Sequence, residues 1–363
     1  MNLQSMEMIS KFLSRVVTLH SLKIQQQSIN FTQRFNHKMS RQRVLVTRGD
    51  IPEPGLSILK NKYDLICWNK TTPIPRSDLL SMVKDVDGIF CLLTDKIDEE
   101  VLTTAGAKLK VVSTMSVGLD HLNLNALKSR GIHVGYTPGV LTDATAELTV
   151  GLLLATSRKL IAAEHALRKG EWTSWSPNWM CGPGLAKSTV GIVGLGRIGA
   201  RVGEYLKPFG VNKILYSSRT EKPDAKKFDG QHVNLNTLLI ESDFVIVTIA
   251  LTPETREMFG KSSFDMMKST AIFINISRGE IVDQSALIDA LKNNKIRGAG
   301  LDVMTPEPIP LDHELLKLDN CVLLPHIGSA AIETRREMSV ITANNISAVL
   351  DGHPENMPSP VII

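Results

Sequence analysis

The chain has 363 residues, of which 43% are hydrophobic and 21% charged, and its formal net charge is +4. This length suggests about two domains, and this composition is typical of a soluble globular protein. No apolar run approaches the roughly 20 residues that a membrane helix needs, and so small a charge does not indicate nucleic-acid binding, so we expect neither membrane nor nucleic acid as a partner.

The cysteines are scattered and form no C-x-x-C pair: Cys67, Cys91, Cys181 and Cys321. This usage predicts free thiols in a reducing compartment. It is not the pattern of a disulfide framework or a zinc site, so no metal is expected.

Residues 1–40 carry five basic side chains and one acid, Glu7, an excess equal to the net charge of the whole chain. One face of a predicted helix there is apolar: Ile9, Phe12, Leu13 and Val16. A basic, acid-poor, amphipathic start resembles a mitochondrial transit peptide, and the alternatives are a disordered leader or an extension before a second start at Met39. We exclude the segment from the fold and expect a cytosolic protein, with mitochondrial import through residues 1–40 as the alternative.

Between residues 43 and 135, short apolar runs of strand type alternate with amphipathic stretches. The pattern predicts strands over 43–47, 63–68, 88–93, 110–115 and 132–135, and helices over 56–61, 77–83, 99–105 and 124–130. Such alternation implies a parallel sheet with helices on both faces. One long helix is predicted over 144–168, and because much of its surface is apolar we expect it to be buried, under its own subunit or against a second one.

The stretch 188–207 reads STVGIVGLGRIGARVGEYLK, which is a short apolar strand, three glycines in G-x-G-x-x-G spacing and an amphipathic helix. This order is the dinucleotide-binding fingerprint. The glycines allow a tight turn, a close backbone approach to a pyrophosphate, and close packing of helix on strand. The unpaired N–H groups and the positive dipole end of the helix attract that pyrophosphate. The predicted cofactor-binding residues are Gly194, Leu195, Gly196, Arg197, Ile198 and Gly199.

The alternation then resumes. Strands are predicted over 213–217, 244–249, 271–276, 298–302 and 321–324, and helices over 235–241, 262–268, 284–293 and 331–350. Two successive units of this kind predict an α/β fold of two doubly wound, Rossmann-like parallel-sheet lobes with the ligand cleft between them.

Ionisable residues stand in three places where open α/β sheets bind ligands. Arg278 follows the apolar run AIFINI, and its planar fork can bind a carboxylate bidentately, although an isolated arginine more often forms a surface salt bridge. Glu307 lies between two prolines in a stiff loop, and His326 follows another strand. Alone they would be a turn acid and a loop histidine. Beside a dinucleotide site, however, the arginine would hold a carboxylate and polarise a ketone, the histidine would donate a proton, and a nicotinamide would supply the hydride.

Four motifs carry a resemblance: the glycine turn at 194–199, Asn-Ile-Ser-Arg-Gly at 275–279, the stretch from Gly-Leu-Asp-Val to Pro-Glu-Pro at 300–308, and Pro-His-Ile-Gly-Ser at 325–329. In this order they resemble the D-2-hydroxyacid dehydrogenase family from about residue 43 to the C-terminus. Three further pieces are similar to its animal glyoxylate and hydroxypyruvate reductase branch: Ser-Val-Gly-Leu-Asp at 116–120, Trp-Thr-Ser-Trp at 172–175 and Cys-Gly at 181–182.

The resemblance implies a role for each residue. Arg278 would bind the substrate carboxylate and carbonyl, and Glu307 would pair with His326, the proton donor. Asp302 would approach the nicotinamide carboxamide. The remaining contacts implied are Ile276 and Gly328 with the cofactor, Ser116, Val117 and Gly118 with the substrate through backbone N–H groups, Ser329 near both, and Trp175 with the partner's active site.

The resemblance also implies an organisation of the chain. A discontinuous substrate-binding domain would comprise residues 41–139 and 332–363, and an NAD(P)-binding Rossmann domain would comprise 140–331. The family forms homodimers through the helical region before the glycine motif, which suits the apolar run 144–168.

The end of the second strand of the cofactor lobe indicates which nicotinamide is used. NAD-dependent Rossmann domains usually carry an acid there, on the ribose 2′-hydroxyl. Here the strand ends in Ser217, Ser218, Arg219 and Thr220, with no acid before Glu221. Hydroxyls and an arginine would donate to the 2′-phosphate of NADP. We therefore predict that Ser218, Arg219 and Thr220 bind the cofactor and that NADPH is preferred, with use of NADH as the alternative.

The implied activity is the NADPH-dependent reduction of small 2-keto acids, glyoxylate to glycolate and hydroxypyruvate to D-glycerate. The two substrates differ by a hydroxymethyl group, which is often worth only about 1–3 kcal/mol, so the sequence does not rank them. The alternatives are another D-2-hydroxyacid dehydrogenase acting on lactate or phosphoglycerate, a formate dehydrogenase, against which Glu307 counts, and a nucleotide-sensing corepressor on the same scaffold.

Overall fold

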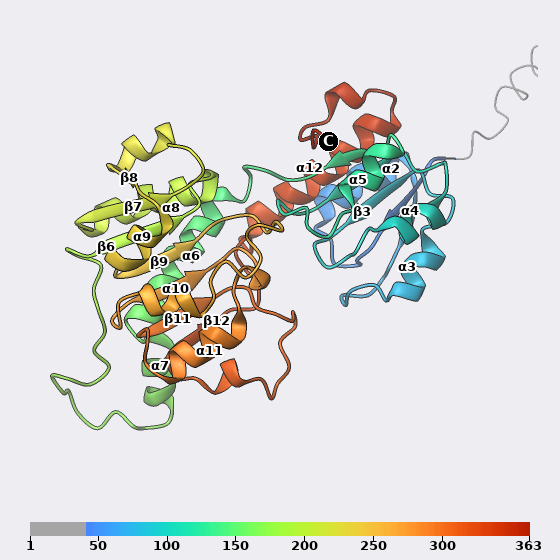
Figure 1. Ribbon diagram of the computed structural model, residues 1–363. Helices are drawn as coiled ribbons and strands as arrows, with labels where there is room; N and C mark the ends of the chain where they lie inside the picture. The colour runs from blue at the N-terminus through green and yellow to red at the C-terminus, as the bar shows by residue number, and fades with distance from the viewer. Residues whose placement is uncertain (1–40) are drawn as a thin grey trace, which may run out of the picture.

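A computed structural model describes residues 41–363 of the protein (Figure 1). The transit-peptide and leader predictions for residues 1–40 lie outside the described residues. Two parallel sheets form two lobes, joined where the chain leaves the first lobe after residue 135 and returns to it near residue 332. Among the helices of residues 41–363, none is both long and apolar enough to cross a membrane.

The five-stranded lobe has the strand order β2-β1-β3-β4-β5, with every pair parallel. Its strands are β1 (Arg43–Val46), β2 (Asp64–Cys67), β3 (Gly88–Cys91), β4 (Val111–Thr114) and β5 (His133–Gly135). Its helices are α2 (Glu53–Lys62), α3 (Arg76–Met82), α4 (Glu99–Ala105), α5 (Leu124–Ser129) and the C-terminal α12 (Ile332–Leu350).

Each face of this sheet is covered by helices that sequence signals define locally. Asp98 and Asn123 cap α4 and α5 by accepting hydrogen bonds from the backbone N–H groups of Val101 and Ala126. These two helices and α3 bury one face, while α2 and α12 pack together on the other. The core beneath α12 contains residues from both ends of the chain, including Val44, Phe90 and Ile346, all without exposed surface.

The seven-stranded lobe has the order β12-β11-β10-β9-β6-β7-β8, again parallel throughout. Its strands are β6 (Thr189–Val193), β7 (Lys213–Ser217), β8 (Gln231–His232), β9 (Phe244–Val247), β10 (Ile272–Asn275), β11 (Gly298–Leu301) and β12 (Cys321–Leu323). Its helices are α6 (Thr142–Ser157), α7 (Leu160–Arg168), α8 (Arg197–Leu206), α9 (Leu235–Glu241), α10 (Lys261–Met266) and α11 (Gln284–Lys292). The strand order reverses at β6, which creates a crevice at the carboxyl ends of β6 and β9. Two parallel α/β lobes confirm the predicted fold class.

The prediction of one continuous helix over 144–168 is wrong. The helix ends at Ser157, and Lys159 has a left-handed backbone (φ 53°) before α7 begins. Whereas α6 buries Leu152 and Leu153 in the core, α7 leaves Leu160 half exposed. A second difference is β8, a two-residue exposed strand without an apolar pattern to predict it.

Candidate active site

A cavity of about 840 Å³ lies between the two lobes, at the carboxyl ends of both sheets. The loops that follow β4, β10 and β12 bring the predicted site residues to its wall. Those that line it are Ser116, Val117, Gly118, Gly196, Arg197, Ile198, Ile276, Arg278, Asp302, His326, Gly328 and Ser329. The cavity thus joins the predicted substrate and cofactor residues in one space.

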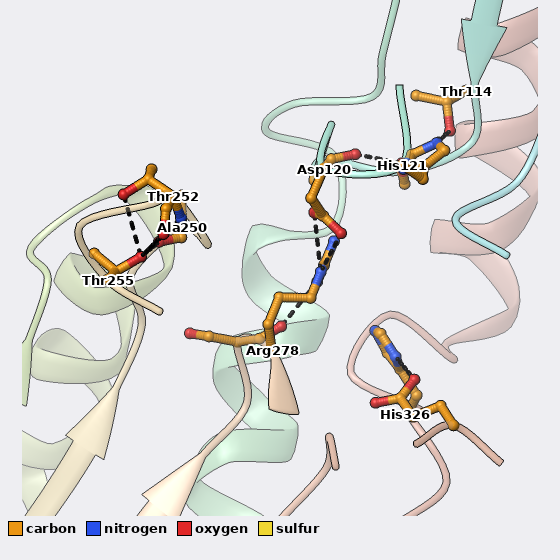
Figure 2. A network of polar contacts seen from close by, with 12 residues as sticks. Thr114, Asp120, His121, Ala250, Thr252, Thr255, Arg278 and His326 are labelled. Atoms are coloured by element: carbon orange, nitrogen blue, oxygen red, sulfur yellow. Dashed lines mark hydrogen bonds and ion pairs between the residues drawn. The ribbon is translucent and has the colours of Figure 1, made fainter. Parts of the chain in front are cut away.

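His326 and Glu307 form a hydrogen-bonded pair. Nδ1 of His326 lies 2.7 Å from Oε2 of Glu307, and the side chains are 23% and 32% exposed (Figure 2). The other carboxylate oxygen, Oε1, accepts a bond of 3.0 Å from the backbone N–H of Met304. Glu307 therefore lies behind the imidazole and fixes Nδ1 as the nitrogen facing away from the cavity, which leaves Nε2 available to a ligand.

The turn that carries His326 is held by Asp302. His326 has a left-handed backbone (φ 54°), which is costly for a residue with a Cβ. The two carboxylate oxygens of Asp302 accept bonds of 2.8 Å from the backbone N–H groups of Ile327 and Gly328. The carbonyl of Asp302 also accepts from the N–H of His326 at 2.9 Å. Burial raises the pKa of this carboxyl group, although the two N–H bonds oppose the effect.

Arg278 reaches across the cleft from the end of β10. Its Nε donates to both carboxylate oxygens of Asp120, at 3.1 and 3.2 Å, and Nη1 donates to the carbonyl of Ser277 at 2.8 Å (Figure 2). Its Nη2 lies against Gly118, where an added Cβ would overlap it. Arg278 and His326 line the same cavity, so a guanidinium and an imidazole face one space.

Hydroxyl groups brace the loop that bears Gly118. The Oγ of Ser116 donates to the carbonyl of Gly118 at 2.8 Å, Oγ1 of Thr114 lies 2.9 Å from that Oγ, and Nε2 of His121 lies 2.9 Å from Oγ1. Because the proton of the Ser116 hydroxyl goes to the carbonyl, Thr114 must donate to Ser116 and His121 must donate to Thr114. Burial lowers the pKa of His121 to about 4, which agrees with a neutral ring protonated on Nε2.

The glycine turn fits a dinucleotide. Gly194 has a left-handed backbone (φ 94°), and a Cβ on it would overlap Ile249. A Cβ on Gly199 would overlap the carbonyl of Gly194, so the strand and α8 need both glycines to approach each other. A Cβ on Gly196 would meet nothing within 4 Å, which leaves an open cradle at the N-terminus of α8 for a pyrophosphate. The side chain of Leu195 is buried in the core, so only its backbone can face a ligand there.

The predicted 2′-phosphate residues lie outside the cavity. Ser218 donates from its hydroxyl to the carbonyl of Thr220 at 2.6 Å, so that proton is engaged locally. Arg219 is exposed, and its charge contributes to lowering the pKa of Glu254, after hydrogen bonds from Thr252 and the backbone. Trp175 is 79% exposed and does not line the cavity of its own chain.

Sequence reasoning missed many residues of the cavity wall, and two groups of them show why. One is the loop 248–251, and its signal was present, because it directly follows the apolar strand Phe244–Val247. The other is Arg335 of α12, whose Nε donates to the carbonyl of Ser329 at 3.1 Å. Burial lowers the pKa of this arginine. No local pattern marks Arg335, since the packing of α12 brings it to the cleft.

A glycine-turn nucleotide lobe, a histidine–glutamate pair and an arginine in one interlobe cavity define a nicotinamide-dependent oxidoreductase. The family model "D-isomer specific 2-hydroxyacid dehydrogenase, NAD binding domain" matches residues 150–328. The chain belongs to the D-isomer specific 2-hydroxyacid dehydrogenase family.

Proteins of similar sequence and structure match most of the chain. The chain is 53% identical over 320 residues to the glyoxylate reductase/hydroxypyruvate reductase of Mus musculus, covering 87% of this chain and 97% of that protein. The corresponding human protein is 51% identical over the same length and coverage. Among solved structures, a protein of Thermus thermophilus matches with a TM-score of 0.83 at 40% identity, covering 88% of this chain and all of the other. The NADPH-dependent glyoxylate/hydroxypyruvate reductase of Sinorhizobium meliloti, in complex with NADP and malonate, matches with a TM-score of 0.76 at 32% identity, covering 89% and 97%.

Proposed function

We propose that the protein reduces the small 2-keto acids glyoxylate and hydroxypyruvate with a nicotinamide cofactor. The observation that carries this proposal is the 2.7 Å His326–Glu307 pair facing the same cavity as Arg278. A reduction of this kind needs a proton donor and a cation for the carboxylate, and both are present. Relatives named for these two substrates, at 51–53% identity over most of the chain, support the substrate class.

Each residue has a defined task in this proposal. Arg278 binds the substrate carboxylate and polarises the adjacent ketone, and the backbone at Ser116, Val117 and Gly118 supplies further N–H donors. His326 gives a proton from Nε2 to the developing alkoxide, while Glu307 orients the ring and stabilises the imidazolium. The cofactor, when bound along the glycine turn, supplies the hydride. Ser329 contacts the substrate, and Ile276, Asp302 and Gly328 border the cofactor.

We further propose that NADPH is preferred over NADH. No acid stands at the tip of β7, and Arg219 offers a guanidinium to a 2′-phosphate. Because the Ser218 hydroxyl already donates to Thr220, Arg219 would carry most of the preference. The NADP complex of the Sinorhizobium meliloti protein is consistent with this choice.

The organisation of the chain is also proposed. We assign residues 41–139 and 332–363 to the substrate-binding domain and 140–331 to the NAD(P)-binding domain, supported by the packing of α12 on α2. The half-exposed apolar residues Leu160, Ile161 and Leu167 of α7, with Trp175 nearby in sequence, favour a homodimer through this region. Light scattering after gel filtration tests the dimer.

The proposed compartment is the cytosol, with mitochondrial import as the alternative. Its support is the four scattered cysteines, which are typical of free thiols in a reducing compartment. Fusing residues 1–40 to a fluorescent reporter tests it, since a mitochondrial signal would overturn the cytosolic proposal.

Turnover tests the central proposal. The protein is mixed with NADPH and either hydroxypyruvate or glyoxylate, and the loss of nicotinamide absorbance is followed. We expect turnover on the ordinary enzyme scale of roughly 1–1,000 per second. Formate, lactate and phosphoglycerate with the matching cofactor forms test the rival dehydrogenases. Background rates with every substrate would favour a nucleotide-sensing binding module and overturn the proposal.

A further inference from the structure

Asp120 faces Arg278 from the opposite lobe. Both of its carboxylate oxygens accept from Nε of Arg278, at 3.1 and 3.2 Å, and both residues line the cavity (Figure 2). Asp120 lies in the loop after β4 of the five-stranded lobe, whereas Arg278 follows β10 of the seven-stranded lobe. The side chains are 30% and 19% exposed, so water and salt screen this ion pair less than one at the surface.

The ion pair decides which edge of the guanidinium is left for a ligand. A guanidinium has five N–H groups. The carboxylate of Asp120 accepts a hydrogen bond from the N–H of Nε, and the carbonyl of Ser277 accepts one from an N–H of Nη1. The remaining three, on Nη1 and Nη2, form the end-on fork, and Nη2 occupies the space that a Cβ on Gly118 would fill. A substrate carboxylate is thus offered the two terminal nitrogens and not the Nε edge.

Asp120 is itself held in place by its neighbours. On one side the hydroxyl chain from Thr114 through Ser116 fixes the carbonyl of Gly118. On the other side the carbonyl of His121 accepts from the N–H of Ile97 at 2.9 Å. Burial opposes ionisation of Asp120, but the charge and the hydrogen bonds of Arg278 outweigh it and hold the pKa of this carboxyl group below its ordinary value. A fixed, ionised carboxylate can set the direction of a flexible arginine.

We propose that Asp120 is a positioning residue that turns Arg278 end-on to the substrate carboxylate and links this orientation to the approach of the two lobes. The proposal rests on the proposed function, in which Arg278 binds that carboxylate. Asp120 touches neither substrate nor cofactor in this scheme, because it acts through Arg278.

If Asp120 positions Arg278, its removal should raise KM for the anionic substrate, whereas simple electrostatics predicts a lower KM. Removing a negative charge beside Arg278 makes the cavity more positive, and an anionic substrate should then bind more tightly. If positioning dominates, the loss of Asp120 frees the guanidinium to rotate, and the substrate binds more weakly. The direction in which KM moves therefore separates a positioning carboxylate from one that merely competes for the arginine.

The test compares Asp120→Asn with wild type in the full chain. We expect KM for glyoxylate to rise about tenfold or more, with kcat changed less, because the arginine loses a charge-assisted bond. The Kd for NADPH and the melting temperature should stay as in wild type, and Asp120→Glu should recover part of the loss. The matched control is Asp229→Asn, which removes a carboxylate paired with Lys207 at 2.9 Å on the surface. It should leave KM unchanged.

A double-mutant cycle tests whether Asp120 acts through Arg278. In an Arg278→Lys background, adding Asp120→Asn should change KM less than twofold. An equal rise in both backgrounds would show that Asp120 only shapes its own loop, and it would overturn the proposal. An unchanged or lower KM in Asp120→Asn alone would overturn it as well.

A failure of the proposed keto-acid reductase function can be told apart from a failure of the positioning role of Asp120. If wild type turns over neither keto acid, that function is lost, and Asp120 is then judged by the binding of malonate, a small dicarboxylate, to the NADPH complex, followed by nicotinamide fluorescence. Malonate binding weakened about tenfold by Asp120→Asn supports the positioning role. Unchanged or tighter binding overturns it.

Discussion

Replacing Asp302 with asparagine tests whether a carboxylate holds the turn that carries His326. The change keeps the size of the side chain and removes its charge. In the native protein the two oxygens accept from the N–H groups of Ile327 and Gly328 at 2.8 Å each. An amide keeps one acceptor and turns an NH₂ group toward the other N–H, so two donors face each other.

The cost can be worked from these contacts. One charge-assisted bond of about 1.5–3 kcal/mol is lost. The left-handed backbone of His326 costs roughly 1–2 kcal/mol, and the two bonds offset that strain. A net loss of about 2 kcal/mol lowers the melting temperature by about 4–8 °C for a lobe of this size. Because His326 then leaves its productive position, kcat should fall at least tenfold, out of the roughly 100- to 10,000-fold that a general acid contributes.

The assay measures melting temperature, the Kd for NADPH and kcat with glyoxylate for Asp302→Asn. Asp243→Asn is the matched control, because Asp243 likewise accepts from a backbone N–H, that of Thr189, at 2.8 Å, but at a distance from the cavity. We expect the control to melt earlier with an unchanged kcat. Wild-type kcat and melting temperature in Asp302→Asn would refute the reasoning. A normal kcat with NADPH binding weakened tenfold would assign Asp302 to the cofactor instead.

Four further substitutions give distinct results. His326→Ala should lower kcat roughly 100-fold or more with NADPH binding intact, and unchanged turnover would remove it as the acid. Arg278→Lys keeps the charge but not the fork, so KM for both keto acids should rise while the Kd for NADPH holds; equality with wild type would contradict this. Arg219→Asp should lower kcat/KM for NADPH at least tenfold more than for NADH, and an unaltered cofactor ratio would exclude its role at the 2′-phosphate. Burial lowers the pKa of His121 to about 4 in the folded protein, from an ordinary value of 6.5. As the pH falls from about 6.5 to 4, this histidine is protonated in the unfolded chain but not in the folded one, so up to about 3 kcal/mol of folding stability is lost. Urea midpoints should fall over this range in wild type and much less in His121→Gln, and parallel curves would rule out His121 as the cause.

The sequence predicted the strands well, because buried parallel strands are apolar runs bounded by turn residues. Lys213–Ser217 was predicted to the residue, and the other predicted strands differ only at their ends. The break between α6 and α7 had no such signal, since no glycine or proline marks the left-handed Lys159. The strand β8 exists only through its pairing with β7, a tertiary contact.

In the candidate site too, features with a local sequence motif could be predicted and features that depend on tertiary contacts could not. Motifs placed Arg278 and His326 just after strands and Glu307 in a loop, and parallel strands share an edge, so a common cavity for Arg278 and His326 could be expected. The pairing of Asp120 with Arg278 could not be predicted in this way, because 158 residues separate the two and only the closing of one lobe on the other joins them. The clamp of Asp302 on the His326 turn depends on a backbone conformation that no residue pattern encodes.

The five-stranded lobe is synthesised first, but its structure is completed last, because its helix α12 comes from the C-terminal part of the chain. Its sheet is complete by β5, yet one wall of its core is α12, whose Met338, Ile346 and Leu350 pack against Val44 and Phe90. About 200 residues separate the two segments. At roughly 5–20 residues per second, translation leaves this face of the sheet covered by α2 alone for about 10–40 s, during which the surface that α12 will bury is open to chaperones or to aggregation. The C-terminal segment joins even later, since the N–H of Val361 bonds to the carbonyl of Val134. A premature stop within α12 would therefore spare the nascent nucleotide lobe and leave the N-terminal lobe without its cover.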